Sequence, residues 1–376
     1  MAPTLERPWE AVTVRDTTRS RREATRKPRA QRMAATLLAG IVVASGALVG
    51  CSAPDPGVVK IALLLPESKT ARYEAFDRPF FEERIAELGD YEVLYSNADQ
   101  DAAKQQSQAE AALASGVKVI VLDPVDSAAA VTIVAAANAQ GVPVIAYDRL
   151  IDGGTLAFHV SFDNENVGVL QGRALVDRLV ADDARGGILM VNGAPTDGNA
   201  ALFKRGALSV IGSSGFEILA DFDTPDWSPD KAQEWVTGQI TQYSGSIAAV
   251  YAANDGTAGG VIAALKAANV TPLPLVTGQD AELAGIQRIV SGDQYMTIYK
   301  AIKLEAGLAA EAAVALANGR PVASENVTGG TPTTLLSAVV VTRDTIMDTV
   351  VADGIYTVAQ ICTDEYAAAC AAAGIR

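Results

Sequence analysis

The sequence predicts an α/β protein with two doubly wound lobes, and three observations lead to this fold class. From Val58 onward, short runs rich in β-branched residues alternate with alanine-rich stretches of helical length, which is the pattern of a parallel sheet covered by helices. The alternation restarts after Asp163 and divides the chain into two halves of similar length. The chain has 376 residues, enough for two lobes of ordinary domain size.

The first half gives its elements in a regular order. Apolar runs of strand length predict strands, and the alanine-rich stretches between them predict helices. The strands are expected over 58–65, 91–96, 117–122, 144–147 and 158–162, with helices that end near Gly89 and that cover 102–115 and 128–140.

The second half repeats this order after a first helix. Strands are expected over 187–191, 217–223 and 248–252, with helices over 199–211, 229–243 and 258–268. The remaining chain predicts strand 275–278, helix 283–291, strand 296–299, helix 301–318, a Gly/Thr/Pro-rich passage over 329–334 and strand 335–341. No long linker separates the halves, so we expect short crossing segments that form a hinge and leave a cleft between the lobes.

The N-terminal segment predicts export and lipid anchoring. Residues 1–32 carry nine basic and four acidic side chains and are followed by a charge-free apolar run over 33–50. Cys51 comes directly after Leu48-Val49-Gly50, as at a bacterial lipoprotein cleavage site. We expect a signal peptide over 1–50, lipidation of Cys51 and a linker over 51–57. The alternative is a single transmembrane anchor, although the apolar run is at the short end of what spans a bilayer.

The net charge and the cysteines limit which molecules the chain is expected to bind and where it is expected to be located. The leader holds nine of the 30 basic and four of the 44 acidic residues, so the mature chain has a net charge near −19 and repels nucleic acid and anionic lipid. Its partners are expected to be neutral, cationic or proteins. Cys362 and Cys370 remain as a pair in an oxidising compartment and predict a disulfide in a C-terminal extension over 357–376. The alternative is two free thiols on one helix, where eight-residue spacing is too long for a bond without a turn.

Several kinds of chemistry are absent from the sequence. His159 is the sole histidine, which excludes a multi-histidine metal site, and we interpret it as a structural histidine with satisfied hydrogen bonds. We expect no cofactor, no metal and no catalysis, because the motifs of phosphate loops, nucleophile elbows and dinucleotide sites are missing. Residues 254–260 resemble an anion loop, but Asp255 repels phosphate, so we interpret Asn254 as a helix cap beside a neutral ligand. Asp221 and Asp223 have the composition of a glycosidase pair, yet a solvated surface is the better interpretation.

Polar and aromatic residues gather where the predicted strands end. Open α/β sheets bind ligands at the carboxyl ends of their strands, and this set suits a neutral polyhydroxylated molecule. Carboxylates accept from its hydroxyls, arginine and lysine donate to them, and asparagine amides do both. Two aromatic rings, one from each half, are expected to pack on opposite faces of a sugar ring. The candidate ligand-binding residues are Arg72, Tyr73, Asp148, Arg149, Asn199, Trp227, Asn254, Asp280 and Lys300.

Each of these residues also has a purely structural interpretation. Asp148 and Arg149 suit a surface ion pair, Trp227 suits packing beneath a loop, and Asn254 suits an N-cap. Their recurrence at strand ends in both halves favours the binding site.

At these residues the sequence resembles a known family. The segments Ala146-Tyr-Asp-Arg149, Ser161-Phe-Asp-Asn-Glu165, Asn254-Asp-Gly-Thr-Ala-Gly-Gly260, Gly278-Gln-Asp-Ala-Glu-Leu-Ala-Gly-Ile286 and Met296-Thr-Ile-Tyr-Lys300 resemble the D-xylose-binding proteins of ABC transporters. The resemblance spans about 58–355 and implies a type I periplasmic binding protein, with two Rossmann-like lobes joined by three hinge segments. It places the crossings near 162–164, 299–301 and 330–334, with an N-terminal lobe over 58–162 plus 301–330 and a C-terminal lobe over 163–300 plus 331–356.

The resemblance implies that Tyr73 and Trp227 stack on the sugar, and that the sugar hydrogen bonds come from Arg72, Arg149, Asn199, Asn254, Asp280 and Lys300. It also shows departures: the family usually has tryptophan where this chain has Tyr73, and the segment after the first strand reads Leu65-Pro-Glu-Ser-Lys-Thr70, where acidic residues are common in the family. Lys69 is therefore added as a candidate for the cavity, and Asp197 is a further candidate.

The expected function is a monomeric, non-enzymatic, lipid-anchored receptor of a Gram-positive actinobacterium. It closes around a monosaccharide, D-xylose first, and delivers it to the permease and ATPase of an ABC transporter. The alternative is a sensor that presents bound glucose, galactose or arabinose to a membrane kinase.

Overall fold

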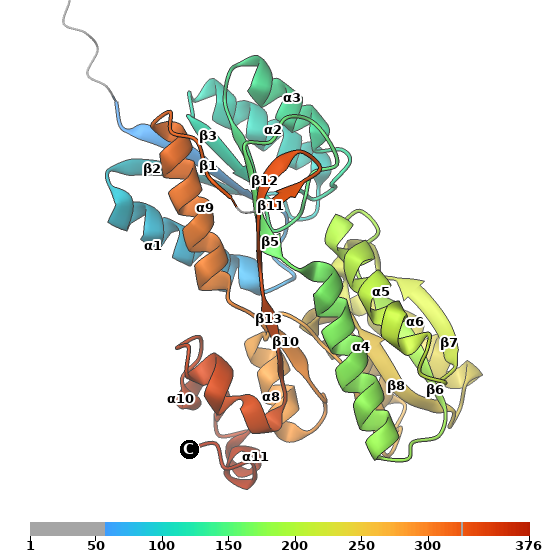
Figure 1. The fold of residues 1–376 in the computed structure, drawn as a ribbon. Coiled ribbons are helices and arrows are strands. Elements are labelled where there is room, and N and C mark those ends of the chain that lie inside the picture. Colours follow the sequence, from blue (N-terminus) through green and yellow to red (C-terminus); the bar gives the residue numbers. More distant parts are fainter. Residues whose placement is uncertain (1–56, 325) are drawn as a thin grey trace, which may run out of the picture. The chain divides into compact units, whose positions relative to one another are not determined.

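Two mainly parallel β-sheets, each covered by helices on both faces, form the computed structural model (Figure 1), which describes residues 57–324 and 326–376. The fold class predicted from the sequence is confirmed. The signal peptide, the lipidation of Cys51 and most of the predicted linker lie outside the described residues and stay predictions.

The first lobe contains a seven-stranded sheet in the order β11-β12-β5-β4-β3-β1-β2. Its central strands are buried on both faces and are continuous apolar runs, as expected for parallel strands between two helical layers. The strands are β1 (Val59–Leu65), β2 (Tyr91–Asn97), β3 (Val119–Leu122), β4 (Val144–Tyr147), β5 (Phe158–Phe162), β11 (Asn326–Thr328) and β12 (Thr331–Leu336).

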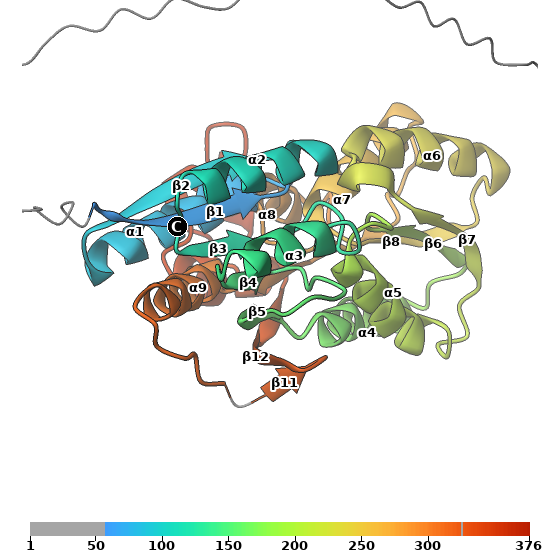
Figure 2. The same cartoon turned by 90° about the horizontal axis from the view of Figure 1, so that it is seen from above.

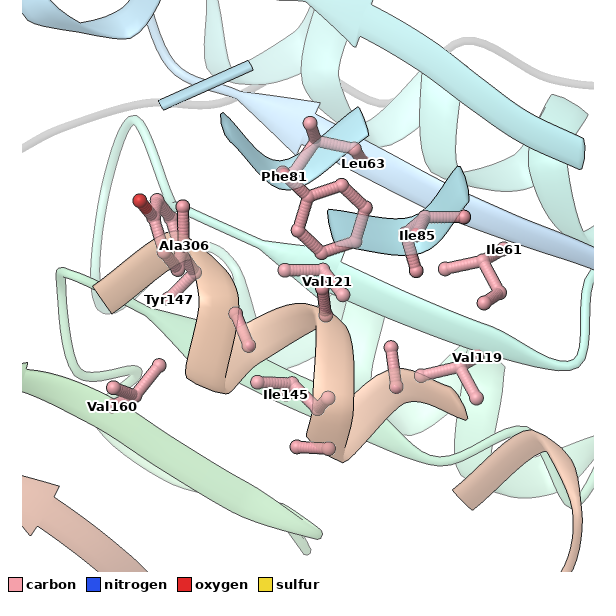
Figure 3. Packing of buried hydrophobic residues seen from close by; sticks show 14 of the residues in the cluster. Ile61, Leu63, Phe81, Ile85, Val119, Val121, Ile145, Tyr147, Val160 and Ala306 are labelled. Atoms are coloured by element: carbon pink, nitrogen blue, oxygen red, sulfur yellow. The ribbon is translucent and has the colours of Figure 1, made fainter. Parts of the chain in front are cut away.

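Two pairs of helices cover this sheet. Helices α1 (Arg78–Leu88) and α9 (Ile302–Ala317) pack together on one face, and α2 (Ala102–Ala114) and α3 (Val131–Ala139) cover the other. Figure 3 shows the first of these layers, where Phe81 and Ile85 from α1 and Ala306 from α9 meet the strand residues Leu63 and Val121. This core fixes the short π-helical turn η1 (Tyr73–Asp77) at the end of β1, which carries part of the site.

The second lobe contains the sheet β7-β6-β8-β9, with strands β6 (Gly187–Asn192), β7 (Ile218–Asp223), β8 (Ile247–Ala252) and β9 (Leu275–Val276). Helices α4 (Asn164–Ala181) and α5 (Gly198–Ile211) lie on one face, and α6 (Pro229–Gln242) and α7 (Asp255–Ala267) on the other, as Figure 2 shows. Helices α4 and α5 touch backbone to backbone. A Cβ on Gly168 would lie 2.1 Å from the Phe203 carbonyl oxygen, and one on Gly206 would lie 1.9 Å from that of Glu165.

A third group of elements completes the second lobe. Helix α8 (Leu283–Ser291) packs beside the two-stranded sheet of β10 (Thr297–Lys300) and β13 (Ala338–Val341), followed by the turns η3 (Arg343–Thr345) and η4 (Met347–Val351). The tail forms α10 (Val358–Ile361) and α11 (Ala367–Ala372), both against α8. The chain turns between these two helices, so Cys362 and Cys370 come within 5.9 Å at their Cα atoms and form a disulfide.

The chain crosses between the lobes three times. It crosses after β5 at 162–164, after β10 at 300–302, where the expected crossing was 299–301, and between β12 and β13 at 336–338. The prediction placed the third crossing at 330–334 and began the second lobe at residue 331. This boundary is wrong, because β12 pairs in parallel with β5 and therefore belongs to the first sheet. The predicted strand 335–341 is accordingly two strands, which run almost in line from lobe to lobe (Figure 1).

No helix in the described part of the chain is both long enough and apolar enough to cross a membrane.

Candidate functional site

A polar cavity lies between the lobes, where the strands of both sheets end. All nine residues predicted to bind the ligand line it, and so does Asp197. Lys69 does not, because its side chain is exposed outside the cavity, and that candidate is withdrawn. The lining residues are Thr70, Arg72, Tyr73, Asp148, Arg149, Asp197, Asn199, Phe203, Trp227, Asn254, Gln279, Asp280 and Lys300.

Turns at the strand ends aim these side chains inward. Asp148 follows β4, Trp227 follows β7 and Asp280 follows β9. Their φ angles are positive: 55° for Asp148, 52° for Trp227 and 88° for Asp280. Asp226, which precedes Trp227, also has a positive φ of 58°. A positive φ is uncommon for residues other than glycine and is a genuine outlier for a bulky side chain such as tryptophan. Such strained backbone concentrates at ligand-binding sites.

Arg72 is fully buried and held from behind by two carboxylates. Its Nε and Nη2 donate to Asp77 at 2.9 and 2.6 Å, and Nη2 also donates to Glu305 at 2.7 Å. Burial lowers the pKa of Arg72, but Asp77, Asp148 and Glu305 outweigh it and keep the pKa above its ordinary value. Its Nη1 lies 3.4 Å from Asp148 Oδ2 and 4.0 Å from Asp280 Oδ1, and the described residues give it no hydrogen-bond partner. Arg72 therefore keeps a free donor on the cavity side.

Arg149 is also buried, which rules out the interpretation as part of a surface ion pair. Its Nη1 donates to the Pro124 carbonyl and its Nη2 to the Tyr73 hydroxyl, each at 3.1 Å. Its Nε lies 3.0 Å from Asp197 Oδ2 and 3.5 Å from Asp123 Oδ1. Burial raises the pKa of both carboxyls despite the nearby Arg149 charge.

Tyr73 connects the two arginines. Its hydroxyl donates to Asp148 Oδ2 at 3.3 Å, and its ring centre lies 5.3 Å from the Arg72 guanidinium carbon and 5.7 Å from that of Arg149. These distances are in the cation–π range. The ring is thus rigidly placed at the cavity wall.

The opposite wall combines charge with aromatic rings. Lys300 Nζ lies 2.9 Å from Asp280 Oδ1 and sits 5.4 and 5.7 Å from the ring centres of Phe162 and Phe203. The Trp227 indole donates to Asp197 Oδ2 at 3.0 Å. Its ring occupies the space beside Gly193, where a Cβ would come within 2.1 Å of it.

The two asparagines have different roles. Asn254 caps α7, since its Oδ1 accepts from the Thr257 backbone and hydroxyl at 2.9 and 2.8 Å, so the predicted cap is present while the residue also lines the cavity. Asn199 Nδ2 donates across the cleft to the Asp148 carbonyl at 3.2 Å and to its Oδ1 at 3.3 Å. Burial raises the pKa of Asp148, but Arg72, Lys300 and Arg149 outweigh it, so the pKa lies below the ordinary value.

The lobes are closed over the cavity. Besides Asn199, Ser127 N donates to Thr196 O at 3.0 Å, and Gln100 Nε2 donates to Asp226 O at 3.2 Å across the rim. Ala71 N donates to Glu282 Oε1 at 3.0 Å.

Sequence reasoning missed part of the site. Thr70, Phe203 and Gln279 line the cavity, and the buried carboxyls of Asp77, Asp123 and Glu305 support its arginines. Gln279 precedes Asp280, and Phe203 lies one helical turn after Asn199 on the same face of α5, so both had a signal in the sequence.

Three other candidates lie elsewhere. Asp221 and Asp223 both bind Lys204, at 2.7 and 2.9 Å, in a partly exposed cluster that does not line the cavity. His159 is buried within β5, as predicted for a structural histidine, and its polar neighbour is the backbone of Asp148. Burial lowers its pKa to about 4 and keeps it neutral. Within 57–324 and 326–376, no group of His, Cys, Asp and Glu is arranged to hold a metal ion.

Two α/β lobes, three crossings and a buried polar cavity define a class of protein that closes over a small ligand by hinge motion. A family model described as a periplasmic binding protein domain matches residues 61–321. The D-xylose-binding periplasmic protein of Escherichia coli is 37% identical over 306 residues, 79% of this chain and 91% of that protein. The protein of the same name from Haemophilus influenzae is 35% identical over 307 residues, 80% of this chain and 91% of that protein.

A solved structure agrees. An ABC transporter solute-binding protein from Clostridium phytofermentans, with bound β-D-glucose, is 30% identical, with a TM-score of 0.72 over 80% of this chain and 99% of that one. The chain belongs to the periplasmic binding protein family, as the sequence resemblance predicted, and is a binding protein, not an enzyme.

Proposed function

We propose that this chain is an extracytoplasmic receptor that binds one neutral monosaccharide, D-xylose in the first place, and delivers it to the permease of an ABC transporter. The names of the relatives support a sugar: two are D-xylose-binding proteins, and the solved neighbour holds glucose. In this proposal the first lobe comprises residues 57–162 and 302–336, and the second comprises 164–300 and the chain from 338 onward.

One observation carries the proposal: a buried donor and a buried acceptor lie side by side at the cavity. Arg72 Nη1 and Asp280 Oδ1 are 4.0 Å apart. Nη1 makes no hydrogen bond to the described residues, and Oδ1 contacts Lys300 Nζ at 2.9 Å, which leaves its second lone pair for a ligand. Buried polar atoms are normally paired. A hydroxyl group accepts from one and donates to the other at once, which is what each hydroxyl of a sugar offers.

The balance of charges in the cavity agrees with a neutral sugar. Three cationic side chains and three carboxyl side chains line the cavity, so neither an acidic nor a basic sugar meets an excess of opposite charge.

The proposed contacts follow from the chemistry of the side chains that line the cavity. Arg72 and Lys300 donate, Asp148 and Asp280 accept, Asn254 offers its amide nitrogen, and Tyr73, Trp227 and Phe203 supply aromatic surface. Three further residues already make hydrogen bonds or ion pairs with protein atoms: Arg149, Asp197 and Asn199. We propose that they form the cavity wall and use their remaining donors and acceptors for the sugar.

Isothermal titration tests the proposal. Residues 52–376, freed of carried-over sugar, are titrated with D-xylose, D-glucose, D-ribose and L-arabinose. We expect one-to-one binding with D-xylose tightest. Preference for another sugar would retain the receptor and change its ligand, and failure of all four to bind would refute a receptor for these monosaccharides.

Anchoring and delivery need experiments in cells. We propose that Cys51 is lipidated after removal of residues 1–50. A Cys51→Ser variant is expected to leave the membrane fraction, and deletion of the gene is expected to reduce uptake of labelled sugar. Unchanged membrane attachment of the variant would contradict the anchor, and unchanged uptake would contradict delivery.

A further inference from the structure

One hydrogen bond between the lobes lies beside two of the proposed sugar-binding residues, although neither of its own partners lines the cavity. The backbone N–H of Ala71 in the first lobe donates to Glu282 Oε1 of the second lobe at 3.0 Å. Ala71 directly precedes Arg72, and Glu282 follows Asp280 by two residues. Neither Ala71 nor Glu282 is among the residues that line the cavity. The bond therefore clamps the two binding segments together from behind.

The second lobe holds Glu282 firmly in place. The Glu282 backbone N–H donates to Asp255 Oδ2 at 2.9 Å, and the same oxygen accepts from the Thr297 hydroxyl at 3.0 Å. Asp255 Oδ1 accepts from Gln294 Nε2 at 2.7 Å. All these partners belong to the second lobe, so they are unaffected when the lobes part, whereas the bond to Ala71 depends on closure.

Charged groups surround the Glu282 carboxyl. In its own lobe these are Asp255 at the start of α7, Asp280 in the same loop, Arg288 on α8 and the Tyr356 hydroxyl. The segment of the first lobe that packs against it carries Glu67, Lys69 and Arg72. Burial, followed by the charges of Asp255 and Asp280, raises the pKa of Glu282 to about 8, and the Ala71 N–H and Arg288 oppose this only in part.

We propose that Glu282 is a closure latch, a positioning residue that joins the lobes in the closed state and takes up a proton as they close, so that ligand affinity falls as the pH rises. The inference rests on the proposed function, since it concerns closure over the same cavity. It adds a residue that controls affinity without touching the ligand.

The direction follows from the two states of the lobe. In the open state Glu282 loses its cover from residues 67–72 and becomes hydrated, which moves its pKa back toward the ordinary value of about 4.3. The proton on Glu282 therefore favours closure and ligand binding. This contribution is complete below the open-state pKa and is lost as the pH rises through the closed-state pKa of about 8. Within that range the affinity falls by at most about tenfold per pH unit. A neutral carboxyl still accepts from Ala71 through its carbonyl oxygen.

The test compares four proteins by isothermal titration with D-xylose, or with the sugar of the panel that binds best. They are the parent, Glu282→Gln, Glu282→Ala and the control Gln100→Ala. The control also removes a hydrogen bond between the lobes, the one from Gln100 Nε2 to Asp226 O at 3.2 Å, but it does not remove a titratable group. Titrations from pH 5.5 to 8.5 give the affinity, and buffers of different ionisation enthalpy give the protons taken up. Thermal unfolding without sugar shows whether each variant is folded.

We expect the parent to take up a proton and to bind more weakly at high pH. Glu282→Gln keeps the acceptor, so it binds within about twofold of the parent at pH 5.5 with less proton uptake and a flatter pH profile. Glu282→Ala loses the bond and binds about 2- to 10-fold more weakly even at low pH, while Gln100→Ala keeps the pH profile of the parent.

Proton uptake by Glu282→Gln equal to that of the parent, or Glu282→Ala binding as tightly as the parent, overturns the latch alone. Failure of the folded parent to bind any sugar overturns the proposed function as well.

Discussion

Replacement of Asp280 by asparagine tests the core of the proposed site. The Asp280 side chain is 4% exposed, and its Oδ1 lies 2.9 Å from Lys300 Nζ and 4.0 Å from Arg72 Nη1. Asparagine keeps the shape of the side chain and removes its charge. The sugar then loses a charged acceptor, and Lys300 loses its nearest carboxylate in the closed state.

The geometry sets the size of the effect. A hydrogen bond to a charged group contributes about 1.5–3 kcal/mol, and each 1.4 kcal/mol is about tenfold in affinity. The affinity of Asp280→Asn is therefore expected to fall by about 10- to 150-fold. The unpaired Lys300 adds to the loss on closure, because a buried charge without its partner is strongly unfavourable.

Titration calorimetry at pH 7 measures the affinity, and thermal unfolding without sugar checks the fold. Asp221→Asn is the matched control, because its carboxylate also binds a lysine, Lys204 at 2.7 Å, but is 39% exposed at the surface. We expect no measurable change in affinity for this control. If Asp280→Asn bound the sugar within twofold of the parent, Asp280 would not be a ligand.

Three further predictions concern affinity and stability. Arg72→Lys is expected to bind sugar at least about tenfold more weakly by calorimetry, because lysine cannot pair with Asp77 and Glu305 in a fork and also reach the cavity. Gly206→Ala is expected to lower the free energy of unfolding in urea by about 1–3 kcal/mol, since its Cβ would lie 1.9 Å from a backbone oxygen. His159→Leu is expected to lose less stability than the parent on acidification, measured by urea unfolding at pH 7, 5 and 4. Burial lowers the pKa of His159 from 6.5 to about 4. The contribution of neutral His159 to the free energy of unfolding is therefore complete above about pH 6.5 and is lost as the pH falls through 4.

Each of these predictions has a result that contradicts it. Parent-like affinity in Arg72→Lys would show that the guanidinium fork is unnecessary. Gly238→Ala in α6 is the control for Gly206, because its Cβ would meet nothing within 4 Å, and equal stability of both variants would refute the backbone-contact argument. An identical acid dependence of His159→Leu and the parent would show that His159 does not titrate on unfolding.

The sequence located the cavity because strand ends can be read from it. A buried apolar run followed by a polar residue marks the edge of a parallel sheet, and this pattern found Asp148 and Asn254. It did not find Glu305, which is separated from Arg72 by 233 residues along the chain and lies inside an alanine-rich helix. Such long-range pairs depend on how α9 returns to the first lobe, which no local pattern encodes.

The misplaced third crossing has a local cause. Residues 329–334 are rich in Gly, Thr and Pro, which favours a loop. In the structure Gly329 and Gly330 have φ angles of 58° and 89° and connect β11 to β12. Positive φ at both central positions is typical of a tight hairpin turn, so the Gly-Gly pair between two short threonine-containing runs was a hairpin signal.

The buried supports explain how the cavity can keep two arginines in place while the ligand is absent. A buried guanidinium needs carboxylate partners. Arg72 pairs with Asp77 and Glu305, neither of which lines the cavity, and Arg149 pairs with Asp123 and with Asp197 in the cavity wall. Because these pairs fix the guanidinium planes, the free Nη1 of Arg72 is oriented before the ligand arrives, and less conformational entropy is lost on binding. The supports of Arg72 come from η1 and α9, and α9 directly follows the crossing at 300–302. The orientation of this donor is therefore tied to the hinge that closes the site.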